Sequence, residues 1–436
     1  MPAQASPKSP DARSKSASQA GARKPAPKTR TPNKAPLKPA ARATPVVAGA
    51  AGAALAMAGK PAPTTPRAGE PEARLIEIYR LIGQARGRDA LARAESLVRD
   101  HPTFQLAQLV YGDLLSSQTR PVRAFGDVPD TTALAAAPML ADLREESKIR
   151  LKALRERPPP GSIPSQFLAL SPRTRHAIAV DASRARLYLF ENSATGLKLI
   201  ADYYISVGKS GLEKTLEGDQ RTPLGVYYIT SNLDPKSLKD FYGSGALPIN
   251  YPNPLDQSRG KTGGGIWLHG TPPGQFSRAP QASDGCVVLA NPDLERIIRT
   301  VEVRSTPVVI AQQLHWAAPH SIRADSKSFE DTLQAWRGAK ASGDLARVLG
   351  FYAPDFRSFS KTLPEWTQTL RGEITGARGR DIELKDVSYL RWTDSADTMV
   401  ATFGEVVDGA RTGTVKRQYW IRRGTQWKIF FEGVIG

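Results

Sequence analysis

The spacing of apolar residues changes twice along this chain, and each change limits what that part can fold into. Between Glu70 and Pro158 apolar residues recur at helical spacing. From Arg175 they alternate with polar residues, which is typical of strands. From about Ser326, helical segments precede strands that are rich in aromatic residues. Three patterns in 436 residues predict a multidomain protein.

The first 68 residues differ from the rest in composition. Ten basic residues and one acidic residue precede Thr44, and ten minus one leaves +9 of the formal net charge of +18 in this tail. We expect the tail to be disordered, because it has too little apolar content to offset the entropy lost on ordering. It also lacks interleaved aromatic residues, so nucleic-acid binding is not expected.

A weakly apolar run follows the basic tail and ends in Ala56-Met57-Ala58. A basic flank, a short apolar stretch and an A-x-A site are the parts of a secretory signal, and an alanine-rich linker is the alternative. A signal would place the protein in the periplasm or elsewhere in the cell envelope. We expect no stable membrane span, because spanning takes about 20 strongly apolar residues.

Residues 69–158 are predicted to form a small helical module. His101-Pro102 is expected to end one helix and open the next, in the manner of a tetratricopeptide-like pair. Packing or formation of a homodimer is favoured over peptide binding as the role of this module. A proline-rich stretch beginning at Pro158 marks a linker.

Cys286 is the only cysteine in the chain, so an internal disulfide and a multi-cysteine metal site are excluded. We expect neither a metal nor a cofactor. Cys286 follows Ser-Asp-Gly, which predicts a sulfur at the junction of a loop and a strand. A catalytic cysteine attacks as a thiolate, which calls for a neighbouring base to lower its pKa from ~8.5. His269 stands seventeen positions earlier at the end of a short strand. On residue chemistry alone, the structural and the reactive interpretations of Cys286 both stay open.

Two stretches, GIWLHGT around His269 and SDGCVVL around Cys286, resemble the signature of the L,D-transpeptidase catalytic domain, the YkuD-type fold. GDQRTPLGVYYI, further upstream, resembles the turn and strand that precede the signature in that family. The likeness covers about residues 175–310. We therefore expect a mostly-β catalytic domain over residues 172–315.

The resemblance implies a role for each residue of the signature. Cys286 would be the nucleophile and His269 the base, with the carbonyl of Gly270 orienting the imidazole. Ser283 and Gly285 would shape the nucleophile loop, and main-chain N–H groups around Gly285 and Cys286 would hold the oxyanion. We also expect three residues to bind substrate: Trp267, Tyr251 and Arg278.

The reaction that the resemblance implies is attack on the L–D amide of peptidoglycan tetrapeptide stems, which gives a thioacyl-enzyme. An amine acceptor would make the protein a transpeptidase, and water would make it an L,D-carboxypeptidase. Many members carry arginine two residues after the cysteine, where this chain has Val288, so the acceptor stays open. A remote alternative is a non-catalytic protein that binds the wall or another polyanion.

Residues 326–436 resemble the NTF2-like, SnoaL-type cone, a curved sheet wrapped by helices, which gives an α+β C-terminal domain. The three-domain layout is similar to L,D-carboxypeptidases that trim wall tetrapeptides and set cell shape. The domain contains no Cys-His unit, so it is expected to bind or position the substrate without catalysing. Truncation before Ser326 is expected to leave a soluble catalytic domain.

Overall fold

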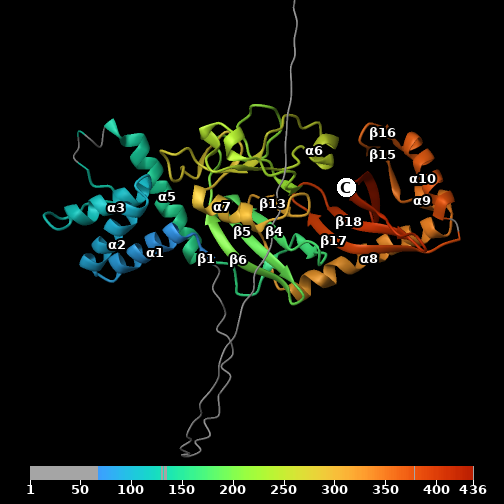
Figure 1. Cartoon of the computed structure of the whole chain (residues 1–436), viewed down its shortest axis with the longest axis horizontal. Coiled ribbons are helices and arrows are strands. Elements are labelled where there is room, and N and C mark those ends of the chain that lie inside the picture. The colour runs from blue at the N-terminus through green and yellow to red at the C-terminus, as the bar shows by residue number, and fades with distance from the viewer. Residues whose placement is uncertain (1–66, 129–130, 132–134, 378, 436) are drawn as a thin grey trace, which may run out of the picture. The chain divides into compact units, whose positions relative to one another are not determined.

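The computed structural model describes residues 67–435 except 129–130, 132–134 and 378 (Figure 1). Helices come first along the chain, a β-rich central domain follows, and an α+β domain ends it, so the predicted multidomain fold class is confirmed. The Ala56-Met57-Ala58 site and nearly all of the basic tail lie outside the described residues. Among the helices that are described, none has both the length and the apolar character to cross a membrane.

The helical module is built from amphipathic helices whose apolar faces meet. Its helices are α1 (Glu70–Gly83), α2 (Gly87–Asp100), α3 (Gln105–Ser116) and α5 (Ala137–Arg155). Leu75 and Ile78, one turn apart on α1, are buried with Phe104 in one core. Helix α2 ends just before His101-Pro102, as the sequence predicts. The same core also contains Phe276, which belongs to the central domain.

The central domain is built on a mixed sheet with the strand order β1-β6-β5-β4-β13-β8. Its strands are β1 (Arg67–Ala68), β6 (Gly196–Tyr204), β5 (Arg186–Ser193), β4 (His176–Asp181), β13 (Pro307–Ala311) and β8 (Gly225–Tyr228). Strands β4, β5 and β6 pair antiparallel, whereas β13 runs parallel to β4. The alternation in the sequence therefore predicts real strands.

The two faces of this sheet enter two different cores. On β4, Ala177 and Ala179 join a core that includes residues of the C-terminal domain, while Ile178 and Val180 join the core of the central domain. Successive side chains of a strand point to opposite faces, so the period of two divides the residues between the cores. Neither β4 nor β13 has an exposed residue.

A second layer of short elements carries the candidate site. A three-stranded sheet with the order β12-β10-β9 comprises β12 (Val287–Val288), β10 (Trp267–His269) and β9 (Ala246–Pro248). Strands β7 (Val207–Gly208) and β11 (Gln281–Ser283) pair beside it. The short helical segments of the central domain are η1 (Ala182–Arg184), which connects β4 and β5, η2 (Pro235–Ser237), η3 (Asp240–Tyr242), α6 (Pro254–Ser258) and α7 (Asn291–Thr300).

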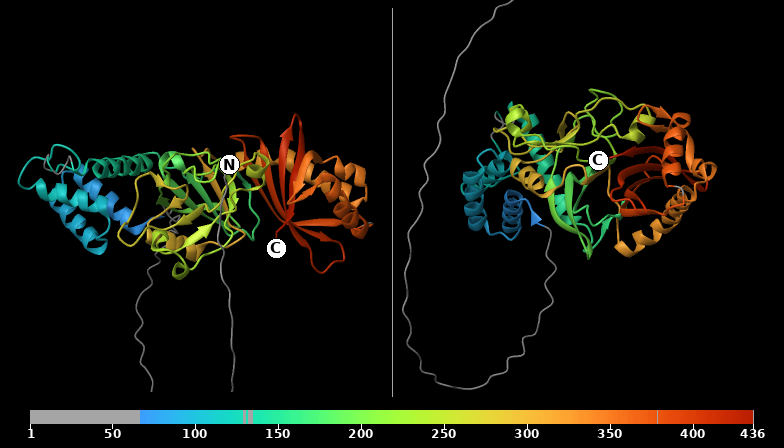
Figure 2. Two further views of the ribbon diagram at one scale, coloured as in Figure 1. Left: turned by 90° about the horizontal axis from the view of Figure 1, so that it is seen from above. Right: turned by 45° about the vertical axis from the view of Figure 1, so that its right-hand side comes forward.

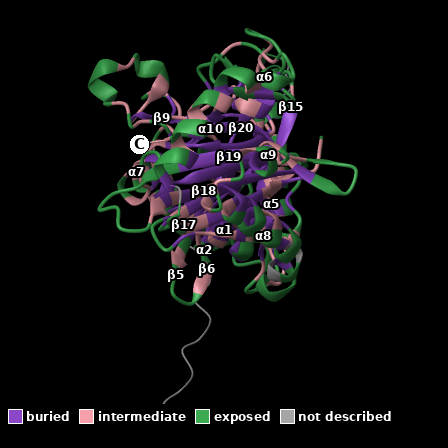
Figure 3. Ribbon diagram, turned by 90° about the vertical axis from the view of Figure 1, so that its right-hand side faces the viewer, coloured by how far each residue is buried: buried purple, intermediate pink, exposed green. Residues whose placement is uncertain are grey.

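The C-terminal domain is a seven-stranded sheet with helices against one face (Figure 2). The helices are α8 (Pro319–Ala341), α9 (Leu345–Leu349) and α10 (Leu363–Ala377). The strands, in spatial order, are β16 (Lys361–Thr362), β15 (Tyr352–Ser358), β20 (Gln426–Val434), β19 (Thr414–Arg423), β18 (Thr398–Val407), β17 (Ile382–Trp392) and β3 (Phe167–Ala169). Strands β18 and β19 are largely buried in their middle parts (Figure 3).

The segment expected to be a linker contributes strands to its neighbours. Strand β3 pairs with β17 at the edge of the C-terminal sheet, and β2 (Ile163–Pro164) pairs with β14 (Trp316–Ala317). Phe190 of the central sheet shares one core with Phe329 and Trp336 of α8. Proline and glycine content signals a chain break locally, but it carries no information about pairing with strands that lie far along the chain.

This shared core changes the expectation for truncation. A chain ending before Ser326 would lose the partner strand of β3 and expose side chains such as Tyr188 and Phe190. Each large apolar side chain returned to water costs about 1.5–3 kcal/mol. We therefore expect the truncated protein to aggregate, whereas the full chain elutes as a defined species in gel filtration. A truncated protein that is soluble and unfolds cooperatively would contradict the shared core.

Candidate active site

His269 is held in one orientation at the end of β10. Its backbone lies between Val288 of β12 and Ala246 of β9, and its side chain is buried. The Nδ1 atom lies 2.7 Å from the carbonyl oxygen of Gly270, the contact that the resemblance implies. With Nδ1–H donating to this carbonyl, Nε2 carries no proton in the neutral ring and is free to accept one.

Cys286 lies on a turn that is fixed by Ser283. The Ser283 hydroxyl donates to the carbonyl of Cys286 at 2.6 Å and accepts from the Gly285 N–H at 3.1 Å. Gly285 has a φ of +121°, and a Cβ at this position would lie 2.7 Å from the carbonyl oxygen of Arg221. Only glycine fits this turn without strain.

In this turn, the two N–H groups expected to hold an oxyanion differ in whether they already have an acceptor. The Gly285 N–H is already engaged by Ser283, whereas the Cys286 N–H has no acceptor among the described residues. The Cys286 N–H is therefore the donor of this pair that remains available to a substrate carbonyl.

Cys286 is partly exposed, and its thiol is protonated at neutral pH. Its sulfur accepts from the Trp267 N–H and donates to the carbonyl of Gly265, each at 3.4 Å. Burial raises the pKa of the thiol to about 11, and the hydrogen bond from Trp267 and the charge of Arg278 offset only part of this increase. The pKa lowering expected for a catalytic cysteine is thus not present in this structure.

His269 is uncharged for the same reason. Burial lowers the pKa of the imidazole to about 4, the hydrogen bond to Gly270 opposes this change, and the charge of Arg278 adds to it. A lowered pKa means that the neutral ring predominates above about pH 4. The two groups therefore rest as a thiol and a neutral imidazole, not as an ion pair.

Two aromatic rings lie against the imidazole, and a third ring and a guanidinium lie against these two. The ring centroids of Phe241 and Tyr242 lie 5.7 and 5.1 Å from that of His269, and Trp267 lies 4.7 Å from Tyr242. The Arg278 guanidinium lies 4.5 Å from the Phe241 centroid and has no carboxylate within ion-pairing distance in the described part of the chain. Arg278 is thus a cation without an ion pair beside the two candidate catalytic groups.

The three residues expected to bind substrate do not lie together. Trp267 and Arg278 border the pair, but the side chain of Tyr251 is 6% exposed. Its hydroxyl donates to the carbonyls of Lys214 and Thr262, so it supports a neighbouring loop. Tyr251 is thus a packing residue in this structure, and its hydroxyl is held by carbonyl groups 11 and 37 residues away along the chain.

Asn291 is a site residue that the sequence analysis missed. Its amide accepts from the N–H groups of Ser244 and Thr271, and it donates to the Thr271 carbonyl at 2.8 Å. A Cβ on Gly270 would lie 2.0 Å from the Asn291 Oδ1 atom, so the backbone that orients His269 passes directly against this amide. The sequence signal, Asn-Pro after an apolar pair, indicates only the start of a helix.

The helical module holds the loop that carries Arg278. Buried Glu146 accepts from Ser277 at 2.8 Å, and Phe276 stacks on Phe104 with a centroid distance of 4.1 Å. The Tyr204 hydroxyl donates to the Arg278 carbonyl at 2.7 Å. The loop is therefore anchored both before Arg278 and at it.

A buried ionic cluster fixes Glu146 in turn. Arg150 binds Glu146 and Glu72, Arg186 of β5 binds Glu72 as well, and the Arg150 guanidinium lies 3.8 Å from the Tyr204 centroid. Removing one partner of a buried pair leaves an uncompensated charge, at a cost of about 3–5 kcal/mol. The module is thus rigidly joined to the central domain.

Phe276→Ala is expected to release this loop, because it removes the ring that stacks on Phe104. Arg278 is 9% exposed, so trypsin should not cut after it in the native protein. In the variant we expect trypsin to cleave rapidly after Arg278, and mass spectrometry of the fragments measures this cleavage. Leu115→Ala, at an exposed position on α3 of the helical module, is the matched control and should leave the loop resistant. Equal resistance of both variants would contradict the anchoring.

The raised pKa of the thiol predicts slow alkylation at neutral pH. With iodoacetamide at pH 7.5, native Cys286 should react at least about tenfold more slowly than the same cysteine in the unfolded protein, since its smaller thiolate fraction outweighs its higher nucleophilicity. The rate should keep rising up to about pH 10. A rate that levels off below pH 8 would show a lowered pKa instead.

Comparison with known proteins bears on both β-containing domains. Residues 175–310 match the family model of the YkuD L,D-transpeptidase catalytic domain, and residues 328–433 match that of the Cds6 C-terminal NTF2-like domain. The chain thus contains a YkuD-type L,D-transpeptidase catalytic domain and an NTF2-like domain, and both expected resemblances are confirmed. No curated protein matched the chain.

Comparison with solved structures also gave matches. Bd1075 of Bdellovibrio bacteriovorus is 23% identical, with a TM-score of 0.53, over 63% of this chain and 98% of that one. The helical cell shape determining protein Pgp2 from Campylobacter jejuni is 22% identical, with a TM-score of 0.47, over 59% of this chain and 91% of that one. An NTF2-like protein from Pseudomonas putida is 18% identical, with a TM-score of 0.21, over 26% and 85% of the two chains.

Proposed function

We propose that this protein cleaves the L–D amide of peptidoglycan tetrapeptide stems and forms a thioacyl-enzyme on Cys286. The observation that carries the proposal is the fixed tautomer of His269, which presents an unprotonated Nε2 in the same YkuD-type domain as the only thiol. Because the wall lies outside the cytoplasm, this function requires export, in keeping with the signal expected at Ala56-Met57-Ala58.

In acylation, the thiol proton passes to Nε2 of His269 as the sulfur attacks the amide carbonyl carbon. The Cys286 N–H donates to the oxygen that becomes negatively charged. When the tetrahedral intermediate collapses, the C–N bond breaks and the imidazolium protonates the leaving amine of D-alanine. Because both groups start neutral, the charges form only during attack, where neighbouring dipoles stabilise them.

Arg278 is the proposed partner of the substrate carboxylate. In many family members an arginine stands two residues after the cysteine, but Val288 is 2% exposed here and pairs with His269 in the sheet. A guanidinium that contacts the substrate carboxylate would therefore come from another segment, or the contact is absent. Arg278 has no ion pair among the described residues, and its charge acts on both Cys286 and His269.

Deacylation decides between two related activities. An amine from a second stem, deprotonated by His269, would give transpeptidation, whereas water activated in the same way would release a tripeptide. Position 288 holds valine instead of arginine, so the usual contact with the substrate differs here. L,D-carboxypeptidase activity is therefore the second candidate.

Incubation of the pure protein with a disaccharide tetrapeptide, with and without excess D-amino acid, tests the proposal. The native protein should release D-alanine, and Cys286→Ala should lower the rate by a factor of about 10⁴ or more, since the nucleophile is lost. Separation of the products distinguishes the acceptors: exchanged tetrapeptides or cross-linked dimers indicate an amine, and tripeptide alone indicates water. Undiminished D-alanine release by a folded Cys286→Ala protein would refute the proposed nucleophile.

A further inference from the structure

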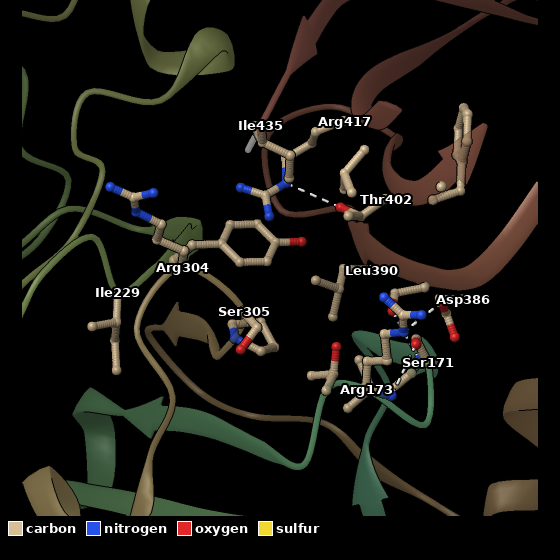
Figure 4. A pocket seen from close by; sticks show the side chains of 18 of the residues that line it. Ser171, Arg173, Ile229, Arg304, Ser305, Asp386, Leu390, Thr402, Arg417 and Ile435 are labelled. Atoms are coloured by element: carbon tan, nitrogen blue, oxygen red, sulfur yellow. Dashed lines mark hydrogen bonds and ion pairs between the residues drawn. The ribbon is translucent and has the colours of Figure 1, made fainter. Parts of the chain in front are cut away.

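A cavity with a volume of about 690 Å³ lies between the central domain and the C-terminal sheet (Figure 4). One wall comes from the end of β8 and the segment around Arg304, and the other from the face of β17, β18 and β19 that points away from helix α8. Cys286 and His269 do not line it. Its volume falls within the range of roughly 300–1,000 Å³ typical of small-ligand sites.

Arg417 of β19 places a buried charge at this cavity. The residue is 7% exposed, its Nε donates to the Thr402 hydroxyl at 3.0 Å, and its guanidinium lies 3.2 Å from the centroid of Tyr228. In the part of the chain that the structure describes, no carboxylate lies within ion-pairing distance of Arg417. Buried charges are normally paired, so this guanidinium lacks the anion that its position calls for.

The rest of the lining combines polar and apolar groups. Tyr228 is buried, and its hydroxyl has no hydrogen-bond partner among the described residues. Arg304 is exposed at the rim, while Arg173 is already bound to Asp386 at 2.7 Å. Apolar side chains such as Ile229 and Leu390 complete the walls. A ligand for this cavity therefore needs one anionic group and an apolar or neutral body.

We propose that this cavity is a second binding site, for a peptide that ends in a carboxylate, with Arg417 as its main anchor. The hydrogen bond to Thr402 uses only Nε of the guanidinium. The two terminal nitrogens lie in one plane and match the two oxygens of a carboxylate. One buried guanidinium and apolar walls suit a singly charged group better than a polyphosphate. The site goes beyond the cleavage proposed for Cys286, and a wall stem peptide is the occupant that this function would supply.

Arg417 also joins the two domains through its stacking on Tyr228, and this contact alone would stabilise the protein without binding anything. The two roles give different results. A purely structural role lowers the melting temperature of Arg417→Gln and leaves ligand binding unchanged, which would overturn the proposal. A binding role changes the number of ligands bound.

The test is a titration of full-length Cys286→Ala protein, which cannot turn over, with a disaccharide tetrapeptide in a calorimeter. We expect two molecules bound per chain, and one in the protein that also carries Arg417→Gln. If the proposed catalytic site does not bind the probe, the numbers become one and none. Failure of one proposal is thus distinguishable from failure of the other.

Two further variants keep the test decisive if Arg417→Gln does not fold. Arg417→Lys keeps the charge but loses the planar pair and should weaken the second site at least about tenfold. Arg304→Gln, at the exposed rim, should weaken it by a smaller factor. Arg371→Gln, an exposed position on α10, is the control and should bind two molecules. Identical binding by all variants, or displacement of the peptide by equimolar inorganic phosphate, would overturn the carboxylate-peptide site.

Discussion

The central sheet has no solvent-exposed face in its middle strands, and the candidate site depends on this constraint. Mixed and antiparallel sheets often leave one face to water, but here alternate residues of β4 and β13 enter two separate cores. One core supports the layer that carries β10 and β12, and the other is shared with the C-terminal domain. The positions of His269 and Cys286 therefore rest on packing contributed by most of the described chain.

Burial also decides the electrostatics of the site. The burial that raises the pKa of Cys286 also lowers that of His269, so transfer of the thiol proton to the imidazole costs free energy in this structure. Among the described residues, a fixed carbonyl, an N–H without an acceptor and a guanidinium without an ion pair lie near these groups and suit the charges of the proposed reaction. Asn291 and Glu146 touch neither the thiol nor the imidazole, yet they hold the backbone and the loop that present these groups.

The sequence predicts the parts of this arrangement that are local. The motifs around His269 and Cys286 lie within one short stretch, and the glycine at 285 follows from the turn that this stretch makes. The bond from Ser277 to Glu146 spans 131 residues, and β3 pairs with a strand more than two hundred residues later. Period and composition carry no record of such contacts. The burial of Tyr251 and the raised pKa of the thiol were missed for the same reason, because both arise from loops that pack over them in the folded chain.

The pairing of β3 with β17 has a consequence for the time at which the protein becomes folded. Residues 167–169 leave the ribosome early, but their partner strand is among the last parts to be made. Long-range pairings of this kind slow folding, since loop closure must precede the contacts that stabilise it. Until the strands of the C-terminal domain are made, the core on one face of the central sheet is incomplete, and the unfinished chain presents apolar surface of the kind that chaperones bind. Synthesis of the C-terminal domain therefore sets the earliest moment at which the loop that carries Cys286 has its full support.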